Sequence, residues 1–117
     1  GGMLPKAAGA VDALREQDIE ATLIDLRTLI PMDTQAVVAS VTETGRLLIV
    51  EEGCRTGGAA GEISTRVFEE AYDYLDAPIR RVTTPDIPIP ASPVLEQAAL
   101  PNTERIVEAA LSLMQEA

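Results

Sequence analysis

The chain has no histidine, no tryptophan and a single cysteine, and only 3% of its 117 residues are aromatic. The absence of histidine excludes Ser-His-Asp and Cys-His catalysis and removes the commonest protein ligand of transition metals. The lone Cys54 cannot form an internal disulfide bond, which is typical of proteins in a reducing compartment. We interpret Cys54 as a residue of a loop between Glu52 and Gly57 and not as a nucleophile, because no histidine can serve as its base.

Basic residues are also scarce, with 9 Lys and Arg against 19 Asp and Glu, so the net charge is −10. This charge disfavours nucleic acids and anionic membrane surfaces as partners, since both are negatively charged. It suits a basic protein partner, although an acidic surface also serves simply to keep a protein in solution. No apolar run approaches the ~20 residues that span a bilayer, and the chain does not open with a signal-peptide pattern.

The most informative segment is LLIVEEGCRTGGAAGE, residues 47–62. Its first four residues are all apolar, which predicts a buried parallel strand, and Glu51 and Glu52 follow that strand directly. Open α/β sheets bind ligands and partners at this edge. The two carboxylates suit either an acid–base pair or a structural role. We favour the structural role, in which one binds backbone N–H groups of the following turn and the other faces solvent or a subunit.

Gly57 and Gly58 stand at the start of the next helix, where backbone N–H groups are able to cradle a phosphate. The segment lacks the Lys-Ser/Thr of a P-loop and the full GxGxxG pattern. We therefore expect the two glycines to allow close packing of the helix on the sheet or on a partner.

Helical and strand-like periodicities alternate along the chain. We predict strands over 21–26, 47–50 and 79–82, and residues 58–75 have the pattern of the longest helix. Asp33 and Asn102 are suited to begin helices, and Gly45 to end one. The residues expected on buried helix faces are Leu4, Ala7, Ala8, Val11 and Leu14; Ala36 or Val37, with Val41; Ala60, Ile63, Val67, Ala71 and Leu75, widened by Phe68 and Tyr72; and Ile106, Val107, Ala110, Leu111 and Met114.

This alternation predicts a three-layer α/β/α domain with a mostly parallel sheet, formed by residues 1–117 as one unit. The core must be aliphatic because aromatic residues are so few. Three strands are few for a covered sheet, so we expect at least one further strand before Gly1 in a longer parent protein. The alternative is a small complete domain that begins with a two-glycine cloning remnant. The proline-rich segment 85–101 is expected to be extended.

Five segments, in this order and at close spacing, resemble a known family. They are IDLRTLIPMD (24–33), TGRLLIVEEG (44–53), TGGAAGEI (56–63), YLDAPIRRV (74–82) and PDIPIPASPVLEQAALPNTER (85–105). Together they resemble the C-terminal domain of the β subunit of thiamine-diphosphate-dependent 2-oxo acid dehydrogenases, which has the transketolase C-terminal fold. The resemblance covers nearly the whole chain.

The resemblance implies a parent enzyme that decarboxylates a 2-oxo acid on thiamine diphosphate and Mg, and passes the acyl group to a lipoyl acyltransferase. Pyruvate, a branched-chain 2-oxo acid and acetoin all remain open as its substrate. In that family the cofactor and the catalytic histidines lie outside this domain, so we expect no catalytic, cofactor-binding or metal-binding residue here. A bacterial cytoplasm or a mitochondrial matrix is the implied location.

The partners implied by the resemblance are an α subunit, a second β subunit and the subunit-binding domain of the acyltransferase, which is small and usually basic. The residues that we name as candidates for partner interfaces are Glu51, Glu52, Gly57, Gly58, Phe68, Tyr72, Glu116 and Ala117. Two rival interpretations remain. One is a self-standing α/β module that binds an anion at Gly57 and Gly58, and the other is a purely structural domain without a docking role.

Overall fold

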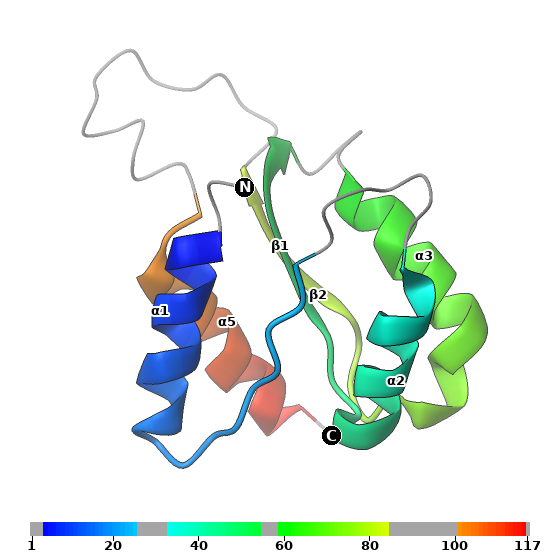
Figure 1. Ribbon diagram of the computed structural model, residues 1–117, viewed down its shortest axis with the longest axis horizontal. Helices are drawn as coiled ribbons and strands as arrows, with labels where there is room; N and C mark the ends of the chain where they lie inside the picture. Colours follow the sequence, from blue (N-terminus) through cyan, green and yellow to red (C-terminus); the bar gives the residue numbers. More distant parts are fainter. Residues whose placement is uncertain (1–3, 26–32, 55–58, 85–100, 117) are drawn as a thin grey trace.

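The computed structural model describes residues 4–25, 33–54, 59–84 and 101–116, with the backbone alone for 52–54, 59 and 84. Its elements are the helices α1 (Leu4–Arg15) and α2 (Thr34–Thr44), strand β1 (Leu48–Cys54), helix α3 (Ala59–Ala71), the 3₁₀ turn η1 (Tyr72–Tyr74), strand β2 (Arg80–Thr84) and helix α5 (Thr103–Gln115) (Figure 1). No helix in this part of the chain is long and apolar enough to cross a membrane.

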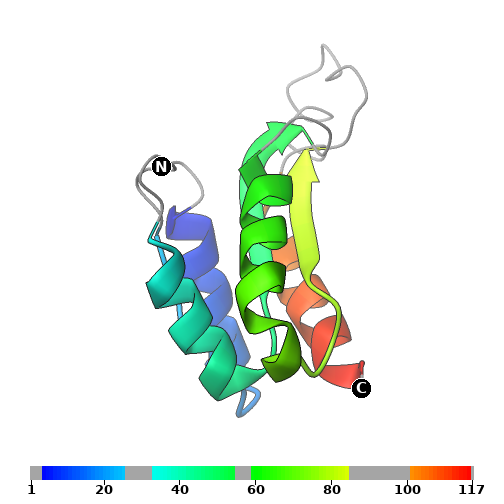
Figure 2. The same ribbon diagram turned by 90° about the vertical axis from the view of Figure 1, so that its right-hand side faces the viewer.

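Strands β1 and β2 pair in parallel, with Leu48 opposite Arg80 and Val50 opposite Val82. Helices α1 and α5 cover one face of this pair, and α2 and α3 cover the other (Figure 1 and Figure 2). Parallel neighbours need a long crossover between them, and α3 supplies the crossover from β1 to β2. The three-layer α/β/α class and the parallel sheet predicted from the sequence are confirmed.

The core consists of two aliphatic clusters, one on each face of the strand pair. Leu47, just before β1, packs toward α2 and α3, whereas Leu48 and Val50 of β1 pack toward α1 and α5. The buried members are Val37, Val41, Val67 and Ala71 in the first cluster, and Ala10, Val82 and Ile106 in the second. The expected core of Val, Ile, Leu and Ala is therefore confirmed.

Local sequence signals place three helix ends correctly, whereas the helix predicted over 58–75 ends at Ala71, is followed by η1 and is no longer than α5. The Asp33 carboxylate accepts a hydrogen bond from the Ala36 N–H at 3.1 Å, and the Asn102 side chain accepts one from the Arg105 N–H at 2.9 Å. Both bonds satisfy an N–H that has no partner within its own helix. Gly45 ends α2 with φ of 74°, a left-handed conformation that favours glycine.

Two predicted helix faces are partly wrong. In α1 the predicted Leu14 is buried, but its buried companion is Ala10 and not Ala8. In α5 the predicted Ile106 is buried together with Leu113, while Met114 is 45% exposed. The reason lies in the contact between α1 and α5. A Cβ atom at Gly9 would lie 3.4 Å from the Thr103 hydroxyl, in ordinary van der Waals contact, and Ala10 packs in one cluster with Ile106 of α5.

The predicted strands differ in two places from the observed ones. Residues 21–25 do not join the sheet among the described residues, although they run in the same direction as β1 in Figure 1. Strand β1 continues to Cys54, so Glu51, Glu52 and Cys54 belong to the strand and not to a following loop. The register of β1 against β2 shifts between Val50 and Cys54. This irregular pairing has no signal in the sequence periodicity, which is why the predicted strand ended too early. The segment 85–100 and residue 26 lie outside the described residues.

We expect the substitution Val67→Ala to lower the free energy of unfolding by about 2 kcal/mol, because the fully buried side chain of Val67 packs between α3 and α2. Urea denaturation followed by circular dichroism measures this change. Leu23→Ala is the control, since Leu23 is 41% exposed and its truncation should cost less. Equal losses in the two variants would contradict the assignment of this core.

Candidate functional site

The carboxyl end of β1 holds the first candidate residue, Glu51. Its side chain is partly buried, and Oε1 accepts a hydrogen bond of 2.8 Å from the N–H of Ala60, the second residue of α3. A helix start has unpaired N–H groups and a partial positive charge, so a carboxylate that binds there stabilises the helix. The structural role that we favoured for one of the two glutamates is thus observed. The side chain of Glu52, together with Gly57 and Gly58, lies outside the described residues.

Phe68 and Tyr72 lie on the outside of α3 and η1. Their exposed fractions are 50% and 63%, so the expectation that they widen the buried face is wrong. The buried positions are Ala60, Val67 and Ala71. Phe68 follows Val67 by one residue, which turns it about 100° around the helix axis and toward solvent. The two rings meet edge to face, with centroids 5.1 Å apart and planes at 65°.

Two adjoining hollows run along the side of α3 that faces the beginning of β2. The first, of about 460 Å³, is lined by Ser64, Phe68, Tyr72 and the residues from Leu75 to Ile79. The second, of about 430 Å³, is lined by Gly61, Ser64, Thr65 and the residues from Ile79 to Arg81. Ser64 and Ile79 belong to both, so the apolar and aromatic hollow continues into a polar one.

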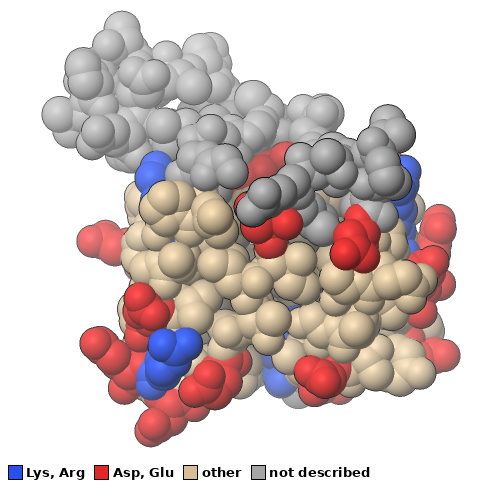
Figure 3. Space-filling model, viewed as in Figure 1, with Lys and Arg blue, Asp and Glu red and all other residues tan. Residues whose placement is uncertain are grey.

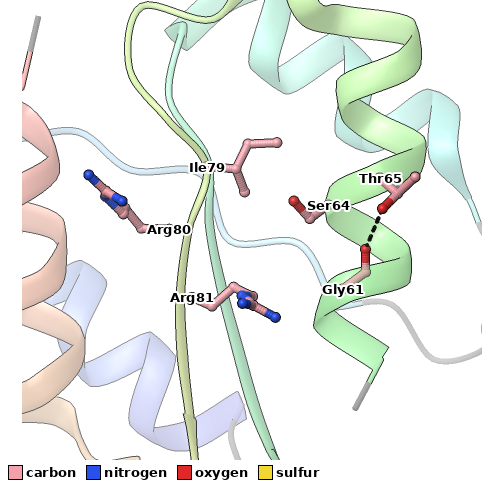
Figure 4. Close-up of a pocket in the computed structure, with 6 residues that line it drawn as sticks. All are labelled: Gly61, Ser64, Thr65, Ile79, Arg80 and Arg81. Atoms are coloured by element: carbon pink, nitrogen blue, oxygen red, sulfur yellow. Dashed lines mark hydrogen bonds between the residues drawn. The ribbon is translucent and has the colours of Figure 1, made fainter. Parts of the chain in front are cut away.

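The polar hollow is open to solvent, and the residues that line it include few groups that could take part in catalysis. Figure 4 shows Arg81 pointing toward α3 and Arg80 pointing away from it. The Thr65 hydroxyl donates to the Gly61 carbonyl at 2.9 Å and is thereby occupied. The lining contains no carboxylate, and the described residues include no group of three His, Cys, Asp or Glu that could hold a metal ion. This part of the chain therefore does not fit thiamine diphosphate with its Mg.

The end of α5 is held by two arginines. Arg80 donates two hydrogen bonds to Glu116 Oε1, of 2.7 Å from Nη2 and 3.2 Å from Nε. Arg46 donates to the carbonyls of Leu113 and Glu116 at 3.3 and 3.4 Å. The candidate Glu116 is therefore turned inward against β2, where it pairs with Arg80. Ala117 lies outside the described residues.

Charged side chains are unevenly distributed over the described residues. On the face shown in Figure 3, acidic side chains lie around the edge and also in the upper middle, and the area below these, in the middle of the face, is uncharged. An uncharged centre with a charged rim is a common layout of protein interfaces. Neither the Arg46 contacts nor the paired hollows were predicted from the sequence. Both depend on segments far apart in the chain, and no local motif signals them.

The class of the domain follows from this architecture and from comparison with known folds. The structure of a protein described as "Split gene transketolase, inactive beta4 tetramer" is similar, with a TM-score of 0.80 and 25% sequence identity. The similarity covers 99% of this chain and 37% of that chain. The family model "Transketolase, C-terminal domain" matches residues 1–106. The chain belongs to the transketolase C-terminal domain family.

Particular relatives are similar over most of the chain. The pyruvate dehydrogenase E1 component subunit beta of Rhizobium meliloti is 47% identical over 104 residues, which cover 89% of this chain and 22% of the relative. The mitochondrial subunit of the same name from Dictyostelium discoideum is 42% identical and covers 91% of this chain and 30% of the relative. The acetoin:2,6-dichlorophenolindophenol oxidoreductase subunit beta of Bacillus subtilis is 40% identical over 99% of this chain and 34% of its own length.

These comparisons confirm the resemblance drawn from the five sequence segments. The chain spans about a quarter to a third of the length of these relatives. Most of the corresponding whole proteins therefore has no counterpart in this chain.

We expect Glu51→Ala to lower the free energy of unfolding by about 1 kcal/mol, because α3 loses the acceptor at its first turn. Glu51→Gln keeps an oxygen acceptor and should retain more of the stability. Urea denaturation measures both variants. Glu70→Ala, at an exposed position of α3, is the matched control and should change little. Equal effects at positions 51 and 70 would argue against the cap.

We expect Arg46→Ala to loosen the end of α5, because the carbonyls of Leu113 and Glu116 lose the hydrogen bonds that Arg46 donates. Hydrogen–deuterium exchange should become faster for the amides of residues 113–116 and stay unchanged for those of α2. Arg66→Ala, which removes an exposed arginine of α3 that pairs with Glu62, serves as control. Unchanged exchange at the end of α5 would contradict the role of Arg46.

Proposed function

We propose that this chain is the C-terminal assembly and docking domain of the β subunit of a thiamine-diphosphate-dependent 2-oxo acid dehydrogenase. The observation that carries the proposal is the 40–47% identity to β subunits of this class over about 90% or more of the chain. The parent enzyme would decarboxylate pyruvate oxidatively and transfer the acetyl group to a lipoyl acyltransferase. The acetoin enzyme is the alternative, because its β subunit aligns with 99% of the chain.

In this proposal the domain contributes no catalytic residue. Thiamine diphosphate and Mg would be held by the α subunit and by another part of the β subunit. The absence of histidine from the chain is compatible with this division of roles. The domain would pack against the α subunit and a second β subunit. An aliphatic α/β unit with an uncharged central face suits such a role.

A further strand of the parent is proposed to complete the sheet. Residues 21–25 run in the direction of β1 and β2 without joining them, and Leu23 of this segment is 41% exposed. One edge of β1 pairs with β2, and the described residues contribute no strand to its other edge. A strand inserted there would pair backbone groups that otherwise need water. A bacterial cytoplasm or a mitochondrial matrix is the proposed location of the parent.

The docking role rests on charge. The net charge of −10 would attract a small basic domain such as the subunit-binding domain of the acyltransferase, and would raise the rate of encounter. A purely structural domain would not depend on this field.

The test is a pull-down with the full-length parent subunit as bait at low and high salt, with the bound proteins identified by mass spectrometry. We expect an α subunit under both conditions, and an acyltransferase that is lost at high salt because salt screens charge. An acyltransferase that stays bound at high salt would overturn the electrostatic basis. Recovery of neither protein would overturn the proposed function.

A further inference from the structure

All aromatic residues of the chain lie within residues 68–74 and are exposed. The sequence contains one phenylalanine and two tyrosines, and these are Phe68, Tyr72 and Tyr74. Each is half or more exposed, at 50%, 63% and 52%. The core is aliphatic and does not use them. Exposed aromatic rings are costly to leave in water and are enriched at the centres of binding sites.

Phe68 and Tyr72 lie beside a hollow that is large enough to accept a side chain. Their rings meet edge to face at 5.1 Å, and both rings border the hollow of about 460 Å³. The far wall of this hollow is the turn from Leu75 to Ile79. We call Phe68, Tyr72 and this hollow the aromatic surface. Both residues remain accessible to solvent beside their mutual contact, Phe68 at 50% and Tyr72 at 63%.

The one charged residue that lines the hollow of the aromatic surface, Asp76, is acidic, whereas Arg80 and Arg81 line the adjoining polar hollow. Glu69 and Asp73 directly follow the two rings in sequence and are exposed, and Asp76 lines the hollow. The nearest arginine in α3, Arg66, is already paired with Glu62 at 2.7 Å. A second copy of this chain would bring the same carboxylates against these, and like charges repel. A cation, in contrast, gains from both the carboxylates and the faces of the rings.

We propose that the aromatic surface binds a segment of a partner protein that carries an arginine or lysine beside an apolar side chain. The cation stacks on the ring of Phe68 or Tyr72 and pairs with Glu69 or Asp73. The apolar side chain enters the hollow beside Leu75. The partner's identity as the acyltransferase rests on the proposed function, but its chemistry follows from the surface alone.

The chemistry is tested by nuclear magnetic resonance on the ¹⁵N-labelled full-length parent subunit, with arginine amide as the probe and neutral citrulline amide as its control. We expect arginine amide to shift the amide signals around Phe68 and Tyr72, and citrulline amide to shift them far less. Shifts spread evenly over all acidic positions would overturn the proposal. Signals at these residues that move with protein concentration alone would indicate a second copy as the occupant and also overturn it.

Variants then separate this inference from the proposed function. In the parent subunit, Phe68→Ala and Tyr72→Ala should each weaken acyltransferase binding about tenfold or more, as truncation of an interface anchor does. Met114→Ala, another exposed apolar position, is the matched control and should bind normally. Melting curves show whether each variant is folded. Asp73→Asn tests the carboxylate that follows Tyr72. Glu108→Gln, at an exposed position of α5, is its matched control.

The outcomes are distinct. Acyltransferase that binds the wild-type subunit and both alanine variants equally well would overturn the aromatic surface and leave the proposed function standing. No acyltransferase bound to the wild type, together with arginine-amide shifts at Phe68 and Tyr72, would overturn the proposed docking partner and support the surface.

Discussion

The parallel pairing of β1 with β2 is the constraint on which the rest of the structure depends. Parallel neighbours need a crossover, and this places α3 between the strands in the chain and on one face of the sheet. Both faces of such strands must be covered, so α1 and α5 pack on one side and α2 and α3 on the other. Because α3 is the next element after β1, the side chain of Glu51 in β1 lies close to the start of α3 and binds its N–H group.

The same arrangement separates aliphatic from aromatic residues. Small branched side chains fill the two thin layers between strands and helices, and no ring is needed there. Phe68 and Tyr72 therefore lie outside the core, on a helix whose inner face is made of Ala60, Val67 and Ala71. Interface residues in such a domain are recognised less by motif than by large apolar side chains that the core leaves unused.

Much of the fold was predictable from local signals. Asp33 and Asn102 begin helices by accepting a hydrogen bond from a nearby N–H group, and Gly45 ends a helix. These roles involve only neighbouring residues, so short sequence patterns identify them. The buried run of β1 was predictable from its unbroken apolar character. Which of two adjacent residues faces the core was not, as Leu113 and Met114 show. A helix presents a wide apolar stripe, and its rotation is set by the helix against which it packs.

The sequence by itself determined the class, the helix ends, the aliphatic core and the family, because these follow from periodicity, capping chemistry and motifs within short stretches of chain. The tertiary structure alone decided which candidate residues are accessible. It turned Glu116 inward onto Arg80, joined Glu51 to α3 and left Phe68 and Tyr72 exposed beside a hollow. The physical reason is that accessibility depends on contacts between segments distant in the chain, such as Arg46 with the end of α5.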